Sequence, residues 1–338
     1  MNQTEKWAMI EEVSKKLDKE LGSTTFQKYG MKVNQQIPVI STNLPSLDRE
    51  VFGCGGVPKG RIIEVYGPES SGKTALCSHI IGQCQKSGGI AAFVDAEHAY
   101  SPTFASKLGV NMNDLIISQP DFGEQALEIV LALVESKAVD LIVVDSVSAL
   151  VPRAELEGDM GDSHMGLQAR MMSQAMRKLV GPVSTSGTTV IFINQIREKI
   201  GLVFGNPEVT SGGRALRFAA TTRLEVRRLA MSKGGVIKEG DAKDGDAIGH
   251  KMSIKAQKNK AGAPFHETEV SLFYDTGFNI HDDTINHCLH IGLVEGNAWL
   301  TIKGEKEKYR REDIPLDKLT EKMHNYYKEL YGKADIKA

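Results

Sequence analysis

An eight-residue motif near residue 70 limits, more than any other feature, what the chain can fold into. Residues 67–74 read GPESSGKT and fit the pattern GxxxxGK[ST], directly after the apolar run 61–66 and directly before apolar residues at helical spacing. This strand–loop–helix context is the one that a P-loop requires. Its glycines let backbone N–H groups converge on phosphate oxygens, and the helix N-terminus adds the positive end of its dipole. The motif predicts a phosphate site made of Gly67, Pro68, Glu69, Ser70, Ser71, Gly72, Lys73 and Thr74.

Polar residues at neighbouring strand ends extend this site. In a P-loop, Lys73 is expected to reach the β- and γ-phosphates and Thr74 to hold Mg²⁺. The metal also needs a carboxylate at the end of a nearby strand, and Asp145 ends the apolar run LIVVD. A solvated strand-end aspartate is the simpler alternative there. Gln195 follows the apolar run VIFIN and can bring an amide to the γ-phosphate.

Phosphate hydrolysis also needs a group that orients or deprotonates water. Glu97 closes the segment IAAFVDAE and can lie at the same carboxyl edge as the P-loop. Position alone does not decide the assignment, because Asp95 and Glu69 compete for the same role.

Apolar segments alternate with helical segments from Arg61 to Gln195, and this alternation predicts the fold class. Near-continuous apolar strands between helices indicate a mostly parallel sheet covered on both faces, with ligands at the carboxyl ends of the strands. Beyond Arg214 the pattern is typical of strands joined by turns, which are antiparallel additions to the sheet. The prediction is an α/β P-loop core with a mostly parallel twisted sheet plus antiparallel strands, an N-terminal helix and a small C-terminal α+β domain. Strands of the parallel part are expected at 61–67, 90–97, 114–118, 140–147 and 188–195.

The two ends of the chain differ from this core. Residues 4–21 have apolar side chains at three- and four-residue steps, which predicts an amphipathic helix with Thr4 as its N-cap and Gly22 as its stop. Its stripe packs either on its own core or on a neighbouring subunit. Residues 231–249 are rich in Gly, Lys and Asp and are expected to form a surface loop or a hairpin tip. The predicted domains are an oligomerisation helix with its linker (1–36), the ATPase core (37–280) and a small module with one short strand (281–338).

Composition excludes several classes of protein. Hydrophobic residues make up 41% of the 338 residues and charged residues 25%, which is ordinary for a globular protein. The four cysteines have no CxxC spacing, so we expect free thiols and a reducing compartment. The longest charge-free stretch, 179–196, is interrupted by Gly and Pro, and no apolar leader is visible, so we expect a cytoplasmic protein. With 41 basic and 43 acidic residues, net −2, any nucleic-acid surface must be local.

Four long strings give the chain a family resemblance. They are GPESSGKTA, VDAEHAY, VDSVSALVPRAELEGDMGDSHMGLQARMMSQAMRKL and FINQIREKIGLVFGNPEVTSGGRAL. In this order they closely resemble the bacterial RecA recombinases, over about residues 39–280. The resemblance implies a RecA-like core that forms ATP-dependent helical filaments on single-stranded DNA, pairs that strand with a homologous duplex, and hydrolyses ATP at subunit interfaces when DNA is bound. It also implies a coprotease role toward LexA-type repressors.

The resemblance assigns the nucleotide site residue by residue. Lys73 and Thr74 become the phosphate and magnesium residues, Asp145 the second metal carboxylate and Glu97 the base that activates water. Phe104 stands where the family usually has a tyrosine that stacks on adenine, so stacking should survive without the hydroxyl. Two further positions belong to this assignment: Tyr274 is placed in the same site, and Ser101 replaces an aspartate common near the adenine.

Two Gly-rich segments, 157–166 and 196–213, match the loops that line the DNA channel in RecA. Neither can be a strand or a helix throughout, and long irregular segments at one sheet edge are commonly functional. Cations there are expected to contact phosphates and apolar side chains to contact bases, while the helix that opens after Gly213 offers N–H groups. The alternatives are a methionine stripe in the core and a solvated arginine face. The expected DNA-contacting residues are Met165, Arg170, Ser173, Arg177, Arg197, Lys199, Ile200, Val203, Phe204, Gly212, Gly213 and Arg214.

A second basic region follows. Residues 221–260 contain ten Lys or Arg and five Asp or Glu, a local net charge of +5. We expect Arg227, Arg228, Lys251 and Lys255 to form a weaker surface for a second DNA strand, with a solvated sheet edge as the alternative.

The resemblance also supplies contacts between subunits. Lys258 and Lys260 match lysines that reach the γ-phosphate held by the adjacent protomer, in the manner of arginine fingers. Ordinary strand-edge lysines are the alternative. Phe218 matches an interface position, and the N-terminal helix docks on the neighbour in this family. Such a heterologous contact propagates as an open helix when its rotation does not close.

Three features point to a divergent member of the family, one that a phage could carry. Glu198 places an acid in the second loop, residues 231–249 are an insertion, and residues 301–338 hold ten basic and eight acidic residues in place of a strongly acidic tail. Arg214 is a further departure, because it stands where asparagine is common. Two alternative functions stay open: a RecA-fold hexameric helicase motor, and a DNA-bound filament scaffold that promotes repressor self-cleavage without strand exchange.

Overall fold

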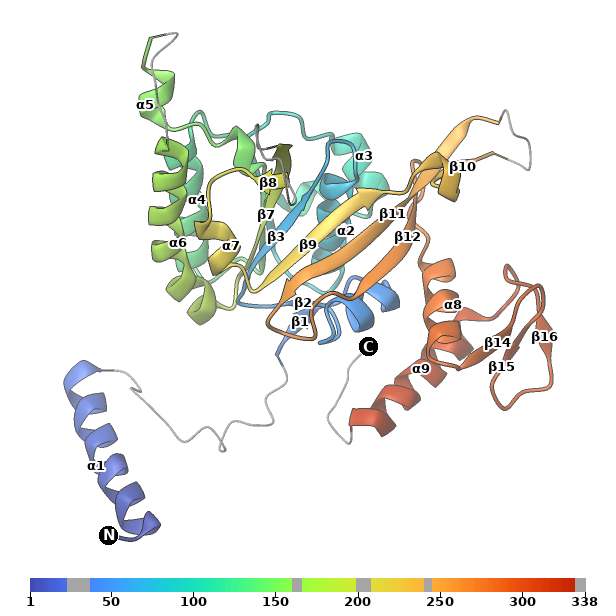
Figure 1. Ribbon diagram of the computed structural model, residues 1–338, viewed down its shortest axis with the longest axis horizontal. Coiled ribbons are helices and arrows are strands. Elements are labelled where there is room, and N and C mark those ends of the chain that lie inside the picture. The colour runs from blue at the N-terminus through green and yellow to red at the C-terminus, as the bar shows by residue number, and fades with distance from the viewer. Residues whose placement is uncertain (23–36, 160–165, 199–207, 240–244, 332–338) are drawn as a thin grey trace. The chain divides into compact units, whose positions relative to one another are not determined.

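The computed structural model describes residues 1–22, 37–159, 166–198, 208–239 and 245–331 (Figure 1). The chain divides into two compact units, Met1–Ile37 and Pro38–Ala338, and each is described by itself.

An eleven-stranded sheet forms the centre of the larger unit. Its strand order is β13-β12-β11-β9-β3-β7-β6-β4-β5, with β10 beside β11 and β8 beside β7. Figure 1 shows the part of this order from β12 to β7. Neighbours from β9 through β5 on this path are parallel, and every pairing on the β11 side, together with β7–β8, is antiparallel. The predicted α/β fold with a mostly parallel core and antiparallel additions is confirmed. The strands are β3 (Ile62–Gly67), β4 (Ala91–Asp95), β5 (Leu115–Ser118), β6 (Leu141–Asp145), β7 (Thr189–Glu198), β8 (Glu208–Thr210), β9 (Thr222–Arg228), β10 (Val236–Lys238), β11 (Ala247–Asn259), β12 (Glu267–Phe273) and β13 (Gly277–Phe278).

Side chains of each parallel strand alternate between two apolar cores, one on each face of the sheet. On β6, Leu141 and Val143 join one core, while Ile142 and Val144 join the other. Helix α2 packs into the first core, and α4, α6 and α7 pack into the second. Burial on both faces explains why these strands have near-continuous apolar sequences. The helices of this part are α2 (Lys73–Lys86), α3 (Pro102–Lys107), α4 (Gly123–Glu135), α5 (Arg153–Leu156), α6 (Leu167–Ser186) and α7 (Ala215–Ala219).

Short elements complete the core. A small antiparallel pair, β1 (Val39–Ile40) and β2 (Val57–Pro58), flanks a π-helical turn at Ser46–Val51. Single 3₁₀ turns lie at Met112–Asp114, Val147–Ala149 and Met231–Lys233. The predicted hairpin tip at 231–249 corresponds to β10 pairing with β11, and residues 240–244 lie outside the described residues.

Among residues 1–22, the described part of the N-terminal unit before its linker, the chain forms helix α1 (Gln3–Leu21). Its N-cap is Asn2, whose side chain forms a capping box with Glu5, so the prediction of Thr4 as N-cap is wrong by two residues. Asn2 is the better cap here because Glu5 stands three residues after it. Gly22 ends the helix in the left-handed conformation, as predicted. No residue of α1 is buried within its unit.

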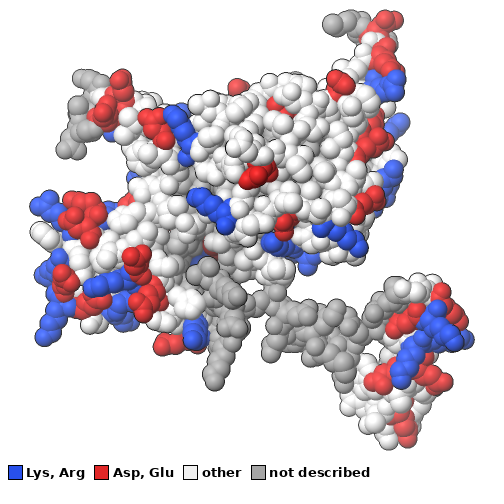
Figure 2. Space-filling view, turned by 180° about the vertical axis from the view of Figure 1, so that it is seen from behind, with Lys and Arg blue, Asp and Glu red and all other residues white. Residues whose placement is uncertain are grey.

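The C-terminal part has its own apolar core. Helices α8 (Ile280–His290) and α9 (Leu316–Tyr331) accompany a three-stranded antiparallel sheet of β14 (Val294–Gly296), β15 (Leu300–Ile302) and β16 (Lys308–Tyr309). Only β15 was expected from the sequence, because its neighbours are short and polar. In the rear view of Figure 2, charges of both signs are interspersed over this part.

Buried polar contacts join the C-terminal part to the core. Ser46 donates hydrogen bonds from its backbone N–H and its hydroxyl to the carboxylate of Asp283. The buried His287 ring lies between Glu50 Oε1, 2.6 Å from Nδ1, and Tyr327 Oη, 2.7 Å from Nε2.

Two predictions from composition concern membrane-spanning helices and the state of the cysteines. Among the described residues, no helix is long and apolar enough to cross a bilayer. All four cysteines are free, as expected.

Candidate functional site

The P-loop connects β3 to α2 and requires its glycines. Gly72 has φ +93°, and a Cβ there would lie 2.8 Å from Cε of Met252. A Cβ on Gly67 would lie 2.0 Å from the carbonyl oxygen of Val226. The contact at Gly67 is with backbone and leaves no room for a side chain, so β9 packs directly against the loop, whereas at Gly72 it is the positive φ that favours glycine. The loop lies between β3 and α2, as its sequence predicted, and its role as a phosphate site stays a prediction.

Lys73 lies within this loop and is 8% exposed. Its Nζ donates hydrogen bonds to the carbonyl oxygens of Gly67, at 3.1 Å, and Pro68, at 2.6 Å. Burial lowers the pKa of Lys73, while the nearby Asp145 and Glu97 carboxylates act in the opposite direction. The ammonium group thus lies against the backbone of the loop.

Thr74 and Asp145 meet at the first turn of α2. The Thr74 hydroxyl donates to Asp145 Oδ2 at 2.6 Å, and burial raises the pKa of Asp145 to about 6. These two oxygen ligands, one of them anionic, are the donors that Mg²⁺ prefers. The residues present therefore fit a magnesium ion beside the P-loop.

Glu97 lies at the carboxyl edge of the sheet, within reach of the same place. Its Oε1 accepts hydrogen bonds from the Ser146 hydroxyl and from Gln195 Nε2, the latter at 2.9 Å. Its competitor Asp95 is buried and already accepts from the backbone N–H groups of residues 99 and 100 and from the Gln119 amide. The structure thus separates two carboxylates that strand position alone left equivalent.

A cavity of about 240 Å³ adjoins the P-loop. Phe104 and Tyr274, both predicted for the nucleotide site, line it with residues 70–75 and Leu272. His250 lines it too and was missed by the sequence analysis: it is 5% exposed, and within the described part of the chain its Nε2 has no hydrogen-bond partner. No sequence signal marks this histidine, because strand β11 and the P-loop lie far apart in the chain. Ser101 is the N-cap of α3, where its hydroxyl accepts from the Phe104 N–H at 3.4 Å.

The ends of the two predicted DNA loops meet at the start of α6. Gly212 and Gly213, at the end of the second loop, have φ of +79° and +77°. A Cβ on Gly213 would lie 2.9 Å from Cβ of Ala169, and one on Gly212 would lie 2.8 Å from Cγ1 of Val147. The second loop therefore returns directly over the first turn of α6, which follows the first loop.

Helix α6 has two faces with different character. Arg170, Ser173 and Arg177 lie on its solvent-facing side, and both arginines are exposed. Its methionines point the other way: residues 171, 172 and 176 belong to the core, which was the simpler of their two interpretations. Of the other predicted DNA contacts, Arg197 and Arg214 are exposed. Met165, Lys199, Ile200, Val203 and Phe204 lie outside the described residues.

The predicted second-strand surface contains two kinds of cation. Arg227 forms ion pairs with Glu208 and Glu225, and Lys255 lies 3.5 Å from Glu267. Arg228 and Lys251 are exposed and, within the described ranges, have no carboxylate within 4.0 Å.

A β-bulge orients Lys258. The register between β11 and β9 shifts between Ala256 and Lys258. Lys258 therefore does not continue the series of buried residues at alternate positions of β11. Its Nζ donates to the carbonyl oxygens of Arg217, at 2.8 Å, and Phe218, at 3.0 Å. Phe218 is 71% exposed, and Lys260 is exposed as well. The predicted trans cation and the predicted interface ring are thus joined through the last turn of α7.

A buried network that the sequence analysis missed supports these strands. Glu64 on β3 is fully buried and accepts from Arg223 Nε on β9 and from Asn194 Nδ2 on β7, the latter at 3.0 Å. The Arg223 guanidinium lies 4.5 Å from the Tyr66 ring centroid, and Asn194 also donates to the carbonyl oxygen of Ser211.

The sequence that forms this site is similar to that of proteins of known family. Residues 8–279 match the family model of the RecA N-terminal domain. The chain belongs to the RecA family. It is 50% identical over 307 residues to Protein RecA of Enterococcus gallinarum, in a match that covers 90% of this chain and 85% of that protein. The match to Protein RecA of Bifidobacterium longum is 46% over 333 residues, 96% of this chain and 81% of the relative.

Membership of the RecA family confirms the expected activity at the level of the family. The protein is a DNA-dependent ATPase and a recombinase, it uses ATP, and it binds DNA and forms filaments. The resemblance drawn from the four sequence strings is confirmed with it.

Proposed function

We propose that ATP is hydrolysed between Lys73, Thr74 and Asp145 on one side and Glu97 on the other. The observation that carries this proposal is the Thr74–Asp145 contact beside the buried Lys73 ammonium group. Lys73 and the P-loop N–H groups bind the β- and γ-phosphates, and Thr74 and Asp145 hold Mg²⁺. Bound Mg²⁺ neutralises charge that develops on the phosphate oxygens. Phe104 and Tyr274 border the cavity and would hold the base by stacking and packing.

Glu97 acts as the general base in this proposal. Its carboxylate takes the proton of the attacking water while the water oxygen bonds to the γ-phosphorus and ADP leaves. Gln195 orients Glu97 through its Nε2 hydrogen bond, and Gln195 lies two residues before Arg197 on the same strand. A conformational change at the γ-phosphate can therefore be transmitted from Gln195 to the predicted DNA contact Arg197 along a single strand.

Neighbouring protomers complete the site. We place Lys258 and Lys260 at the γ-phosphate of the adjacent protomer, where they stabilise transition-state charge. Phe218 lies at the same interface, and its exposure supports contact with another chain. Residues 1–36 act as an oligomerisation segment, because α1 exposes Met9, Val13 and other apolar side chains within its own unit.

DNA is bound on two surfaces. The first strand contacts Arg170, Ser173, Arg177, Arg197 and the Gly212–Arg214 segment, together with the predicted loop residues outside the described ranges. The homologous duplex is sampled at the second surface, Arg227, Arg228, Lys251 and Lys255. In the proposed division of the chain, the core covers 37–280 and the C-terminal domain 281–338. Promotion of LexA-type repressor self-cleavage stays a prediction, which incubation of DNA-bound filaments with such a repressor would test.

ATP turnover with and without single-stranded DNA, across a titration of protein concentration, tests the shared site. We expect DNA stimulation and a cooperative dependence on protein concentration. Lys73→Ala should abolish hydrolysis, because phosphate charge is no longer stabilised. Lys86→Ala removes an exposed lysine from the other end of α2 and is the matched control. Near-normal turnover by Lys73→Ala, or turnover independent of protein concentration, would contradict the proposal.

A further inference from the structure

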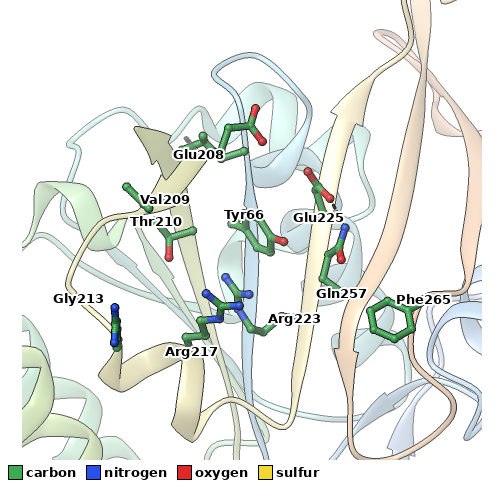
Figure 3. A pocket seen from close by; sticks show the side chains of 12 residues that line it. Tyr66, Glu208, Val209, Thr210, Gly213, Arg217, Arg223, Glu225, Gln257 and Phe265 are labelled. Atoms are coloured by element: carbon green, nitrogen blue, oxygen red, sulfur yellow. Dashed lines mark hydrogen bonds between the residues drawn. The ribbon is translucent and has the colours of Figure 1, made fainter. Parts of the chain in front are cut away.

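The guanidinium of Arg227 is occupied from two sides. Its Nε donates to Glu225 Oε1 at 2.6 Å, and its Nη2 forms an ion pair with Glu208. Glu225 lies two residues away on β9, whereas Glu208 arrives from β8, 19 residues earlier in the chain. Figure 3 shows Glu208 and Glu225 together at one end of a pocket, with Arg217 and Arg223 toward the other.

The two carboxylates hold Arg227 in different ways. Glu225 is largely buried and held on both sides: its side chain is 13% exposed, and its second oxygen accepts a hydrogen bond from Gln257 Nε2 at 2.6 Å. The Glu208 side chain is 29% exposed and the Arg227 side chain 41% exposed. Glu208 therefore pairs with Nη2 of a guanidinium that is still partly open to solvent or to a ligand.

A carboxylate and a phosphate bind a guanidinium through the same kind of contact. Both present anionic oxygens to its N–H donors, frequently two at once. A DNA phosphate that binds Arg227 through Nη2 therefore competes with Glu208 for that group. Arg228 and Lys251, on the same predicted surface, have no such competitor among the described residues.

We propose that Glu208 is an internal competitor for DNA at Arg227 and keeps second-strand binding weak. The inference rests on the proposed assignment of Arg227 to the second-strand surface. Weak binding suits a surface that must release each duplex it samples. The competitor is carried by β8, which pairs with β7, the strand that holds the first-strand residue Arg197 opposite Val209. Glu208 thus links the affinity of the second-strand surface to the β7–β8 pair, which also carries Arg197 of the first DNA site.

Second-strand capture by preformed filaments tests this proposal. The full-length chain is assembled on an unlabelled single strand with a slowly hydrolysed ATP analogue, and a labelled non-complementary strand is titrated while its anisotropy is followed. Glu208→Gln should tighten capture by about twofold to fivefold, the upper part of the range expected for loss of a partly exposed competing ion pair. The slope of log affinity against log salt should steepen by about 0.7, one further phosphate contact on a single strand.

Two further variants separate this effect from a general change in charge. In an Arg227→Gln background, Glu208→Gln should no longer tighten capture. Glu267→Gln removes the same charge beside Lys255, and its effect should be equal with and without Arg227. Glu208→Asp keeps the charge but draws it back by one methylene, so its affinity should lie between those of the wild type and Glu208→Gln. If Glu208→Gln does not form filaments on the first strand, the comparison of Glu208→Asp with the wild type tests the proposal instead.

The outcomes distinguish the inference from the function on which it rests. If Glu208→Gln tightens capture equally in the Arg227→Gln background, or does not tighten it at all, Glu208 does not compete at Arg227 and the inference is overturned. If Arg227→Gln changes capture in neither background, Arg227 is not part of the second-strand surface, and the proposed assignment fails first.

Discussion

Replacing Glu64 by glutamine should destabilise the core by about 3–5 kcal/mol, the usual effect of removing one partner of a buried ion pair. Glu64 is fully buried and Arg223 is 7% exposed, so neither charge is solvated when its partner is lost. The glutamine carbonyl can still accept from Asn194, which isolates the effect on Arg223. The Tyr66 ring beneath the guanidinium offsets only about 0.5–2 kcal/mol.

Chemical unfolding of the full chain, followed by circular dichroism, measures this change. The matched control is the double variant Glu64→Met with Arg223→Met, which replaces both charges by apolar side chains of similar length. It should lie within about 1–2 kcal/mol of the wild type, because a buried pair is often no more stable than its apolar replacement. Asn194 keeps the Ser211 carbonyl as a partner in that variant. A loss below about 1 kcal/mol for Glu64→Gln, or a double variant as unstable as the single one, would refute the reasoning.

Three further predictions concern the nucleotide site and the junction with the C-terminal part. Glu97→Gln should keep ATP and DNA binding and slow turnover by about two orders of magnitude or more; loss of binding would make Glu97 structural. Phe104→Ala should weaken ATP binding by about tenfold or less in an equilibrium titration, since stacking contributes about 0.5–1.5 kcal/mol, and Phe104→Tyr should not. Burial raises the pKa of Asp283 to about 6, from 3.8, so between these values the folded state holds a proton that the unfolded state has lost. The free energy of unfolding should therefore fall as pH rises from about 4 to about 7, with up to about 3 kcal/mol from this group, and Asp283→Asn should show a shallower fall in unfolding titrations across that window.

Strand-end positions made the phosphate side of the site predictable from sequence. Lys73, Thr74 and Asp145 lie where a P-loop and the end of a parallel strand must place them, because parallel strands share one carboxyl edge. The choice of Glu97 over Asp95 was not available from position. What distinguishes the two carboxylates is hydrogen bonding in the turn after β4, where backbone N–H groups donate to Asp95.

Contacts between elements that lie apart in the chain could not be predicted from the sequence. His250 on β11 lines the cavity beside the P-loop, and Glu208 on β8 contacts Arg227 on β9, although β8 and β9 are not paired and no local pattern encodes either contact. The bulge that orients Lys258 is likewise a single unmatched residue within an otherwise regular alternation. Such features arise where the chain meets itself across long separations, and periodicity carries no information about them.

The length of β11 has a consequence for the filament. This one strand carries His250, at the cavity beside its own P-loop, and, eight residues later, Lys258, which we assign to the nucleotide of the next protomer. At about 3.3–3.4 Å per residue, these positions are about 27 Å apart along a strand that pairs with β12 over its first part and with β9 over its second. On the proposed assignments, the spacing between a protomer's own nucleotide and the cation that it supplies to its neighbour is therefore set by one strand within the protomer.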